Sequence, residues 1–354
     1  MVSSLPTLKV AIRSLDYSQV IDLKHYIQEQ VELFKIKNEC LAEVSKNLEK
    51  RLCCPSCKSQ KFTKWGKYKN RQRYQCKDCS RTFNTLSETP FHYLHYHDKA
   101  LEYIYFMIKN KTLRELAEQC DISLPTSFAW RHKFLKALFQ VNEPKLCDTI
   151  YTDDMIFFPC YTGSRKIEQE AGRKAYKRGE SNDKSEKFMV LTAVDSKGNR
   201  IIRCLNDHIR VNNLKNNLGP FVRRKPKNQD ILVSDGQICY KNFAKAKNMI
   251  HKIIRTSYGQ YKTPDNYSLS RVNNLHNRIR RWLGLWINTA SKYLQRYLDY
   301  FRIFEKTKNI KEPFSQIICH IFTKKNTFCP VRALQEDQRG SLRTCSCRQL
   351  AVFV

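Results

Sequence analysis

A short apolar run in the middle of the chain constrains the fold more than any other feature. Residues 149–158 (TIYTDDMIFF) combine β-branched and aromatic residues, which predicts a strand buried on both faces. The run also carries Asp153 and Asp154, and a buried carboxylate without a partner costs several kcal/mol. Either Lys or Arg side chains pair with these acids, or Asp153 is a metal ligand on a strand of an α/β core.

Two later segments bear on this choice. Residues 231–236 (ILVSDG) predict a second apolar strand, which ends in the carboxylate of Asp235 before a glycine turn. Residues 269–286 predict a helix whose buried stripe has helical spacing: Val272, Leu275, Ile279, Trp282 and Trp286. Asn273 and Arg280 share another face of this helix, where an amide oxygen and a guanidinium suit a site beside phosphate. A solvated helix face explains the same pattern, because Asn is a weak Mg²⁺ ligand.

The charge balance predicts a polyanionic partner. The 64 Lys and Arg residues outnumber 33 Asp and Glu residues and give a net charge of +31, spread along the 354-residue chain. Neutralising phosphates with such residues releases counterions and raises affinity, so nucleic acid is the expected partner. A membrane is the weaker alternative, because no apolar stretch approaches the ~18 residues of a spanning helix. The first residues (MVSSLPTLKV) also lack the apolar region of a signal peptide.

The cysteines predict bound metal in an intracellular protein. Their number is 15, odd and without an export signal, which favours reduced thiols over a disulfide framework. Two CxxC pairs, separated by 18 residues, have zinc-ribbon spacing: Cys54, Cys57, Cys76 and Cys79. Each pair predicts a knuckle that presents two thiolates to one structural Zn²⁺ at about 2.3 Å. Cys53 is an alternative to Cys54, and two redox motifs are the other explanation. Gly66 is expected at the turn of the hairpin between the knuckles.

The segment between the knuckles has the composition of a phosphate-binding surface. Its basic residues alternate with aromatic ones, and we expect four of them to contact DNA: Lys64, Lys67, Arg71 and Arg73. A ribbon of this size is too small to fold without its zinc, so the metal is expected to hold the DNA-contacting surface in shape.

A helix-turn-helix is predicted after the ribbon. Thr112 and Glu115 form a capping box at the start of one short helix, and residues 123–126 (SLPT) begin a second one. The second helix is expected to direct four polar side chains toward DNA: Thr126, Ser127, Arg131 and Lys133. A plain αα-hairpin is the alternative, because this motif is loosely defined in sequence.

From residue 146 onward the pattern predicts an α/β fold. Five strands and three helices are expected in the order 149–158, 188–195, 200–205, helix 211–222, 230–234, helix 241–249, 251–256 and helix 269–286. A hairpin of early strands followed by alternating helix and strand is the order of a ribonuclease H-like mixed sheet. A doubly wound nucleotide-binding fold is the competitor, but no GxGxxG or GxxxxGK[ST] follows any of these strands.

These signals divide the chain into expected domains. They are an N-terminal helical segment (1–50), a zinc ribbon (51–91), a helix-turn-helix DNA-binding region (92–143), a ribonuclease H-like core (146–306) and a C-terminal tail (307–354). A long charged loop is expected over residues 163–187 of the core.

The combined motifs resemble a known family. The order CPSC, RYQCKDCSRTFN, ETPF, TDD, SDG, VNNLHNRIR and TASKYLQRYLDYFR is similar to bacterial insertion-sequence transposases of the DDE superfamily that carry a zinc ribbon. In that group Asn often replaces the third acid, with Lys or Arg seven residues later. The resemblance implies that Asp153 and Asp235 are the two catalytic carboxylates, Asn273 the third position and Arg280 its basic partner. The 38 residues between Asp235 and Asn273 suit this assignment.

The resemblance also implies a reaction and its partners. The expected activity is metal-dependent cleavage and strand transfer of DNA, in which Asp153, Asp235 and Asn273 hold Mg²⁺ or Mn²⁺. The implied partner is double-stranded DNA, both the terminal inverted repeats, which the zinc ribbon and helix-turn-helix would bind, and the target DNA. Pairing two ends requires a homodimer or a higher oligomer. Such a protein would act on DNA in the bacterial cytoplasm. Two alternatives are a catalytically inert DNA-binding regulator derived from a transposase, and a nuclease or resolvase of the same fold.

Overall fold

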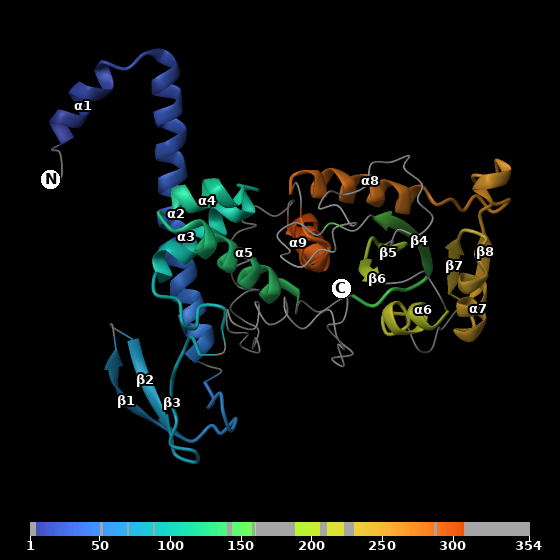
Figure 1. The fold of residues 1–354 in the computed structure, drawn as a ribbon, viewed down its shortest axis with the longest axis horizontal. Coiled ribbons are helices and arrows are strands. Elements are labelled where there is room, and N and C mark those ends of the chain that lie inside the picture. Colours follow the sequence, from blue (N-terminus) through green and yellow to red (C-terminus); the bar gives the residue numbers. More distant parts are fainter. Residues whose placement is uncertain are drawn as a thin grey trace, which may run out of the picture. The chain divides into compact units, whose positions relative to one another are not determined.

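The computed structural model describes residues 5–49, 52–68, 71–87, 89–139, 144–157, 160, 188–205, 211–222, 230–286 and 289–307. The chain divides into two compact units, Met1–Trp130 and Arg131–Asn309 (Figure 1). The division falls inside one long helix, so the domain boundaries expected from sequence stay a proposal. The predicted loop over residues 163–187 and the tail after residue 307 lie outside the described residues.

The N-terminal unit is helical except for one small sheet. Its elements are α1 (Leu5–Arg13), α2 (Tyr17–Glu49), β1 (Phe62–Tyr68), β2 (Arg71–Cys76), β3 (Thr82–Asn84), α3 (His97–Ile108), α4 (Leu113–Gln119) and the first half of α5 (Leu124–Phe139). α2 begins where Asp16 Oδ1 accepts the backbone N–H of Gln19, and Gln19 Oε1 accepts that of Asp16. This reciprocal pair satisfies two otherwise free donors of the helix start. α2 meets α3 through Tyr105, whose hydroxyl donates to Glu32 at 2.6 Å.

The two short helices start as the sequence predicts. Thr112 Oγ1 accepts the backbone N–H of Glu115, and the Glu115 carboxylate accepts that of Thr112 at 2.7 Å, so the capping box of α4 is complete. Ser123 Oγ accepts the backbone N–H of Thr126 at the start of α5. Asp121, with a left-handed φ of 47°, lies in the turn between the helices.

The small sheet has the strand order β1-β2-β3, and all of its pairs are antiparallel. β1 and β2 pair as far as Tyr68 and Arg71, so Gly66 lies inside β1 rather than at the hairpin turn. The register shifts between Lys64 and Lys67, and Gly66 has a φ of +66°, which together define a β-bulge. The predicted turn at Gly66 was wrong because a positive φ serves a bulge as well as a turn.

The C-terminal unit contains a five-stranded mixed sheet in the described part of the chain, with the order β6-β5-β4-β7-β8. The strands are β4 (Thr149–Phe157), β5 (Phe188–Asp195), β6 (Arg200–Leu205), β7 (Ile231–Ser234) and β8 (Ile250–Ile253). β4, β5 and β6 are antiparallel neighbours, whereas β7 and β8 run parallel to β4. This is the ribonuclease H-like order expected from the sequence, and the predicted fold class is confirmed.

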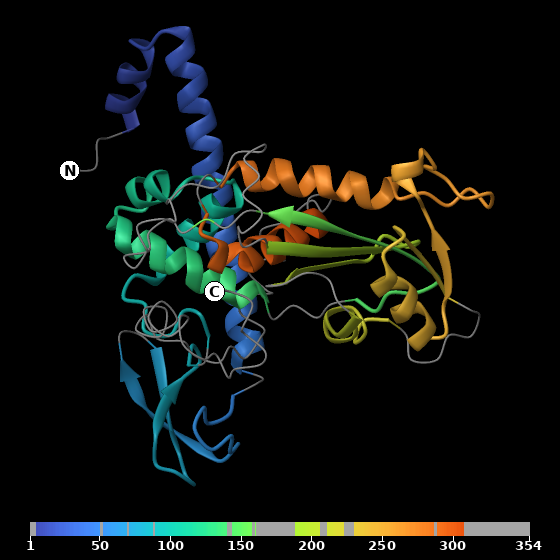
Figure 2. The same ribbon diagram turned by 45° about the vertical axis from the view of Figure 1, so that its right-hand side comes forward.

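Helices cover the sheet on both faces (Figures 1 and 2). The helices are α6 (Val211–Asn217), α7 (Ile238–Ala246), α8 (Ser270–Gly284) and α9 (Leu294–Thr307). α6 and α7 share one hydrophobic core with the sheet, in which Ile150 packs with Leu214 and Phe243. α8 lies on the opposite face. α9 flanks the edge strand β6, where Gln295 accepts the backbone N–H of Cys204 and so pairs part of an open sheet edge.

The helix α6 is shorter than predicted, because it ends at Asn217 whereas the apolar pattern continues to residue 222. A Cβ at Gly219 would lie 2.3 Å from the carbonyl oxygen of Lys215, so only glycine fits this tight exit from the helix. Pro220 follows, and its ring cannot continue a helix.

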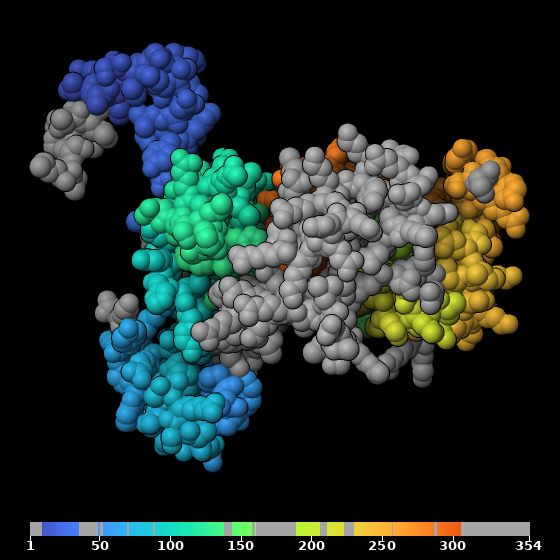
Figure 3. All heavy atoms as spheres, viewed as in Figure 1, coloured from blue at the N-terminus to red at the C-terminus, as the bar shows by residue number. Residues whose placement is uncertain are grey.

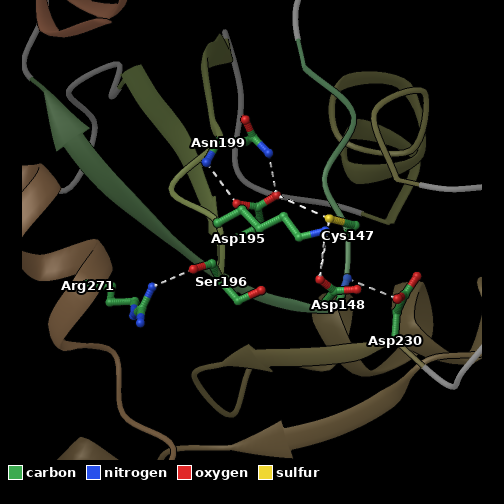
Figure 4. Close-up of polar contacts among 8 residues, drawn as sticks. Cys147, Asp148, Asp195, Ser196, Asn199, Asp230 and Arg271 are labelled. Carbon is green, nitrogen blue, oxygen red and sulfur yellow. Dashed lines mark hydrogen bonds and ion pairs between the residues drawn. The ribbon is translucent and has the colours of Figure 1, made fainter.

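A buried polar network fixes the end of the sheet at which β4 begins (Figure 4). Asp195 is fully buried at the end of β5 and accepts both the backbone N–H and the side-chain amide of Asn199 at 2.8 Å. Gly198, with a φ of +84°, lets the chain reverse toward β6. Asp230 accepts the backbone N–H of Asp148 at 3.1 Å, which links the chain before β4 to the chain before β7. The network therefore connects the ends of four strands: β4, β5, β6 and β7.

Helices with the length and apolar content needed to cross a bilayer are absent from the part of the chain that the structure describes.

The Asp195 network gives a first prediction. Replacing Asp195 with Ala leaves the Asn199 donors without their buried acceptor, so unfolding free energy should fall by about 2–4 kcal/mol. Chemical denaturation followed by circular dichroism measures this. Lys197→Ala is the matched control, since that exposed side chain in the same turn should change stability by less than about 0.5 kcal/mol. Equal losses in the two variants would contradict the role of the network.

Candidate functional site

Three carboxylates gather where β4 extends past the end of β7. Thr149, Ile150 and Tyr151 of β4 pair in parallel with residues 231–233 of β7. Continuing this register by two residues brings Asp235 beside Asp153. The carboxylate oxygens of Asp153, Asp154 and Asp235 lie within 4.8 Å of one another. The sheet thus joins side chains that are about eighty positions apart in the sequence.

The two adjacent aspartates of β4 meet different helices. Successive residues of a strand point to opposite faces of the sheet. Asp154 lies on the α7 side, where its Oδ1 accepts the Gln237 amide at 3.3 Å and the Tyr240 hydroxyl at 3.5 Å. Asp153 lies on the α8 side, where His276 Nδ1 is 4.0 Å from its Oδ2. Asp235 follows the end of β7, and its Oδ1 accepts the backbone N–H of Gln237 at 3.3 Å.

The two carboxylates on β4, Asp153 and Asp154, resist ionisation. Burial, with further contributions from the charges of Asp154 and Asp235, raises the pKa of Asp153 to about 7. Burial and the charge of Asp235 also raise the pKa of Asp154. Close carboxylates in a partly buried site repel each other unless protons or cations are supplied. The cluster therefore stores electrostatic free energy that a bound cation would release.

His276 occupies the α8 side of the site. It is 5% exposed, and its Nε2 lies 2.6 Å from Thr192 Oγ1 on β5. Burial, followed by the charge of Arg280, lowers the pKa of His276 to about 4, so the ring is neutral at physiological pH. The Thr192 hydroxyl also donates to the backbone carbonyl of Asp153 at 2.9 Å, which ties histidine and carboxylate to one residue of β5.

Asn273 and Arg280 lie on the same helix as His276, one turn before it and one turn after it. Both side chains are exposed on α8. The buried stripe predicted for this helix is confirmed, since Val272, Leu275, Ile279, Trp282 and Trp286 are at most 7% exposed. Assignment of Asn273 and Arg280 to the site stays a prediction.

The donor atoms of the carboxylate cluster suit a hard divalent cation. Mg²⁺ and Mn²⁺ prefer carboxylate oxygens, and three such groups converge here. Burial and the charges of the neighbouring carboxylates raise the pKa of Asp153, and a bound cation would offset both effects. On both counts the residues fit a metal site of the kind expected from the sequence.

A second cluster, of four cysteines, lies in the N-terminal unit. The sulfur atoms of Cys54, Cys57, Cys76 and Cys79 lie within 4.8 Å of one another. Cys54 and Cys79 are 3.4 Å apart, as are Cys57 and Cys76. Thiolates on a tetrahedral Zn²⁺ are about 3.8 Å apart at a Zn–S distance of about 2.3 Å. The four thiols therefore form a site that could hold zinc.

The two knuckles share one backbone geometry. In the first, Lys58 donates its N–H to the Cys54 carbonyl at 2.9 Å; in the second, Ser80 donates to Cys76 at 3.1 Å. Lys58 and Ser80 each follow the second cysteine of a pair and have φ values of 61° and 57°. The equivalence identifies Cys54, and not Cys53, as the partner of Cys57. A small apolar cluster of Cys54, Tyr74, Cys76 and Phe83 is the buried core of this ribbon.

The predicted DNA-contacting residues of the ribbon are accessible to different degrees. Lys64 and Lys67 are exposed on β1, as are all residues of this strand after Phe62. The strand belongs to the part of the N-terminal unit drawn in blue at the lower left of Figure 3. Arg71 and Arg73 on β2 are half-buried. Trp65 and Tyr68 are also exposed, so aromatic rings alternate with the lysines along this strand. The four basic residues stay predicted DNA contacts.

Two predicted DNA contacts on α5 need correction. Ser127 is fully buried, and its hydroxyl donates to the carbonyl of Leu113 at 2.8 Å. Arg131 is 1% exposed, and its guanidinium stacks 4.6 Å from the Trp286 ring. Neither side chain reaches a surface. The helical phase of α5 was assigned from polarity, whereas a serine that bonds a neighbouring carbonyl and an arginine that stacks on tryptophan both pack inside.

The other two predicted contacts on α5, Thr126 and Lys133, are half-buried. Burial lowers the pKa of Lys133 to about 8, which marks it as largely removed from water. Both stay predictions.

Sequence reasoning assigned no role to two site residues. Asp154 was part of the initial observation, but its contact with α7 required the fold. His276 lies four residues after Val272 and three before Ile279, so its spacing alone would have placed it beside the buried stripe. Its contact with Asp153 depends on how α8 crosses the sheet.

Part of this chain is similar to known transposable-element proteins. Residues 160–302 match the family model described as the ISXO2-like transposase domain. The match includes Asp235, Asn273 and Arg280 and begins seven residues after Asp153. An uncharacterized protein in the transposable element ISH50 of Halobacterium salinarum is 30% identical over 144 residues, which are 40% of this chain and 49% of the relative. The chain thus spans about half the length of the curated relative it matches.

Solved structures of Mos1 transposase are also similar. The mariner Mos1 paired-end complex with Mg is 14% identical, with a TM-score of 0.28 over 66% of this chain and 77% of that one. The paired-end complex with the left transposon end is 12% identical, with a TM-score of 0.24 over 64% and 80% of the two chains. The fold assignment rests on the strand order, and the resemblance to transposases on the matched domain.

The cysteine cluster predicts one zinc ion per chain. Cys54→Ser should lose that zinc and unfold the ribbon, because its buried core is too small to stand alone. Zinc release measured with a chromogenic chelator, together with limited proteolysis of residues 52–87, tests this. Cys53→Ser is the matched control and should keep the zinc. Loss of zinc from Cys53→Ser but not from Cys54→Ser would refute the assignment.

The raised pKa of Asp153 predicts a pH-dependent stability cost. A carboxyl whose folded pKa of about 7 exceeds its ordinary 3.8 stabilises the fold while protonated, and this contribution is lost as pH rises through 7. Asp153→Asn should therefore melt a few degrees above the wild type at pH 8 without Mg²⁺ or Mn²⁺, and no higher at pH 4. Scanning calorimetry measures both. The exposed Asp265→Asn should show no such difference, and an unchanged Asp153→Asn profile would contradict the electrostatic account.

Proposed function

We propose that this chain, whose residues 160–302 match a transposase domain, is a DNA transposase of an insertion sequence. The observation that carries the proposal is the convergence of Asp153, Asp154 and Asp235 at the end of a ribonuclease H-like sheet. The reaction is phosphoryl transfer: cleavage at an element end, followed by joining of the freed 3′-OH to target DNA.

Some residues of the site would bind cations, and others would position the phosphate. Asp153 and Asp235 would hold divalent cations, Mg²⁺ or Mn²⁺, and Asn273 would add a neutral oxygen. Bound cations supply Lewis-acid stabilisation of the charge that develops on the transferred phosphoryl group. Arg280, exposed on α8, would bind a neighbouring phosphate as a fixed cation. Gln237 and Tyr240 orient Asp154 by hydrogen bonds to its carboxylate.

DNA binding would involve both units. The zinc-loaded ribbon presents Lys64, Lys67, Trp65 and Tyr68 on one strand, which suits phosphate contact with adjacent stacking. Arg71, Arg73, Thr126 and Lys133 complete the proposed contact set. The net charge of +31 supports a large electrostatic share in affinity, so binding should weaken steeply with salt. We propose terminal inverted repeats and target DNA as ligands, a homodimer or higher oligomer as the acting form, and the bacterial cytoplasm as its place.

An inert DNA-binding regulator is the second candidate. It needs the ribbon and the helices but has no use for three repelling carboxylates. An inert scaffold would be more stable with at least one of them neutral, because burying these charges is costly. The raised pKa values of Asp153 and Asp154 therefore favour the catalytic proposal. A nuclease or resolvase would differ in cutting DNA without joining ends.

Strand transfer on DNA that carries the element's ends tests the proposal. Asp153→Ala and Asp235→Ala should each reduce joining by at least about a hundredfold with Mg²⁺ or Mn²⁺ while DNA affinity stays the same. Asn273→Ala should reduce it less, because an amide is a weaker ligand. Product gels and a gel-shift assay provide the two measurements.

Asp265→Ala is the control for this experiment. It removes an exposed carboxylate that pairs with Lys252, away from the cluster, and should leave joining unchanged. Full activity in Asp153→Ala or Asp235→Ala would end the catalytic assignment. Cleavage without joining in the wild type would favour the nuclease.

A further inference from the structure

We propose that His276 is a metal ligand that, together with Asp153, holds a second divalent cation on the α8 side of the sheet. The inference rests on the proposed transposase function and specifies how α8 takes part in the site. It concerns a nitrogen ligand that adds to the carboxylate cluster, and it is compatible with a role for Asn273.

The position of His276 is the first observation. The side chain lies on the buried face of α8, and its Nδ1 is 4.0 Å from Oδ2 of Asp153. Two donor atoms that bind one ion at about 2.1 Å each lie at most about 4.2 Å apart. The pair is therefore too far apart for a hydrogen bond and within the span of two ligands of one cation.

The hydrogen bonding of the His276 ring is the second observation. The Thr192 hydroxyl has one proton, which it donates to the carbonyl of Asp153. Its oxygen must then accept from His276 Nε2, 2.6 Å away, so we assign the neutral ring's proton to Nε2. Nδ1 consequently turns a lone pair toward a carboxylate oxygen. Two electron-rich atoms face each other in a buried place, and a cation between them would turn this repulsion into attraction.

The histidine is held in place by its surroundings. Metal-binding histidines commonly donate their second ring N–H to an oxygen that fixes tautomer and orientation, and Thr192 provides this contact. Arg271 anchors the start of α8: its guanidinium donates to the Ser196 carbonyl at 3.1 Å (Figure 4) and lies 5.6 Å from the Tyr151 ring centroid. Near the end of the helix, Arg278 forms an ion pair with Glu305. The ring therefore needs no reorganisation to bind.

Asp153 links the two metal positions. On one side it belongs to the oxygen cluster with Asp154 and Asp235, and on the other it faces His276. Each position then has a distinct donor set, oxygen alone in the first and oxygen with nitrogen in the second. Imidazole favours Mn²⁺ over Mg²⁺, so the second position should discriminate between these ions whereas the first should not.

Mn²⁺ titration of the full-length, zinc-loaded protein, followed by the electron paramagnetic resonance signal of free Mn²⁺, tests the inference without reference to activity. The wild type should bind two Mn²⁺ per chain in addition to zinc. His276→Ala should bind one, or bind the second at least about tenfold more weakly. The exposed neighbour Asn277→Ala is the matched control and should bind both ions as the wild type does.

A second variant guards against misfolding of His276→Ala, which removes a buried ring. His276→Glu replaces nitrogen with oxygen and should keep the second ion, with the ratio of Mn²⁺ to Mg²⁺ affinity lowered toward that of the carboxylate cluster. An unchanged ratio of Mn²⁺ to Mg²⁺ affinity in His276→Glu would overturn the inference. It would also be overturned if folded His276→Ala bound two Mn²⁺ with wild-type affinity, or if the wild type bound a single Mn²⁺.

The strand-transfer assay separates this inference from the function on which it rests. If the wild type joins DNA ends and His276→Ala binds both ions with wild-type affinity, the ligand assignment is wrong and the transposase proposal stands. If the wild type joins no ends with either metal while His276→Ala loses one ion, the metal position is real and the transposase proposal fails.

Discussion

Repulsion among Asp153, Asp154 and Asp235 is the constraint on which the C-terminal unit depends. Three carboxylates within 4.8 Å are held together only because the strands that carry them are fixed by their own hydrogen bonds. At the far end of the sheet, Asp195, Asn199 and the contact of Asp230 with Asp148 set the register of these strands. The hydrogen-bonded end of the sheet thus stabilises the fold, while its acidic end gathers the charge that the proposed catalytic site would use.

The two helices beside the acidic cluster have different functions. α7 supplies neutral donors, Gln237 and Tyr240, which hold Asp154 on one face of the sheet. α8 brings His276 to Asp153 on the other face and carries Arg280 outward. Carboxylates that share a strand end are thereby placed in unlike surroundings. Under the proposed function the two faces would serve different oxygens, because the attacking and leaving oxygens of an in-line displacement lie on opposite sides of the phosphorus.

The proposed zinc ribbon presents a different physical problem, that of a sheet too small to bury a large core. Its buried cluster consists of Cys54, Tyr74, Cys76 and Phe83, with three partly buried residues packed against it: Leu52, Phe62 and Cys79. Three of these seven residues are proposed metal ligands. Folding free energy must then come from metal coordination, and the exposed strand β1 is left available for lysines and aromatic rings. Lysines can be placed on β1 because its exposed side chains are not needed to fill the core.

The sequence by itself determined the order of the strands and helices in the C-terminal unit and which four cysteines gather in one cluster, because these follow from local periodicity and spacing. The extents of β5 and β6, the capping box at Thr112 and the pairing of Cys54 with Cys57 are set within a few residues of the chain. Only the tertiary structure decided which polar residues meet. Ser127 and Arg131 turned inward, and His276 met Asp153, because side-chain direction depends on how a helix rotates against its neighbours. That rotation is fixed by packing across the whole unit, which no local pattern contains.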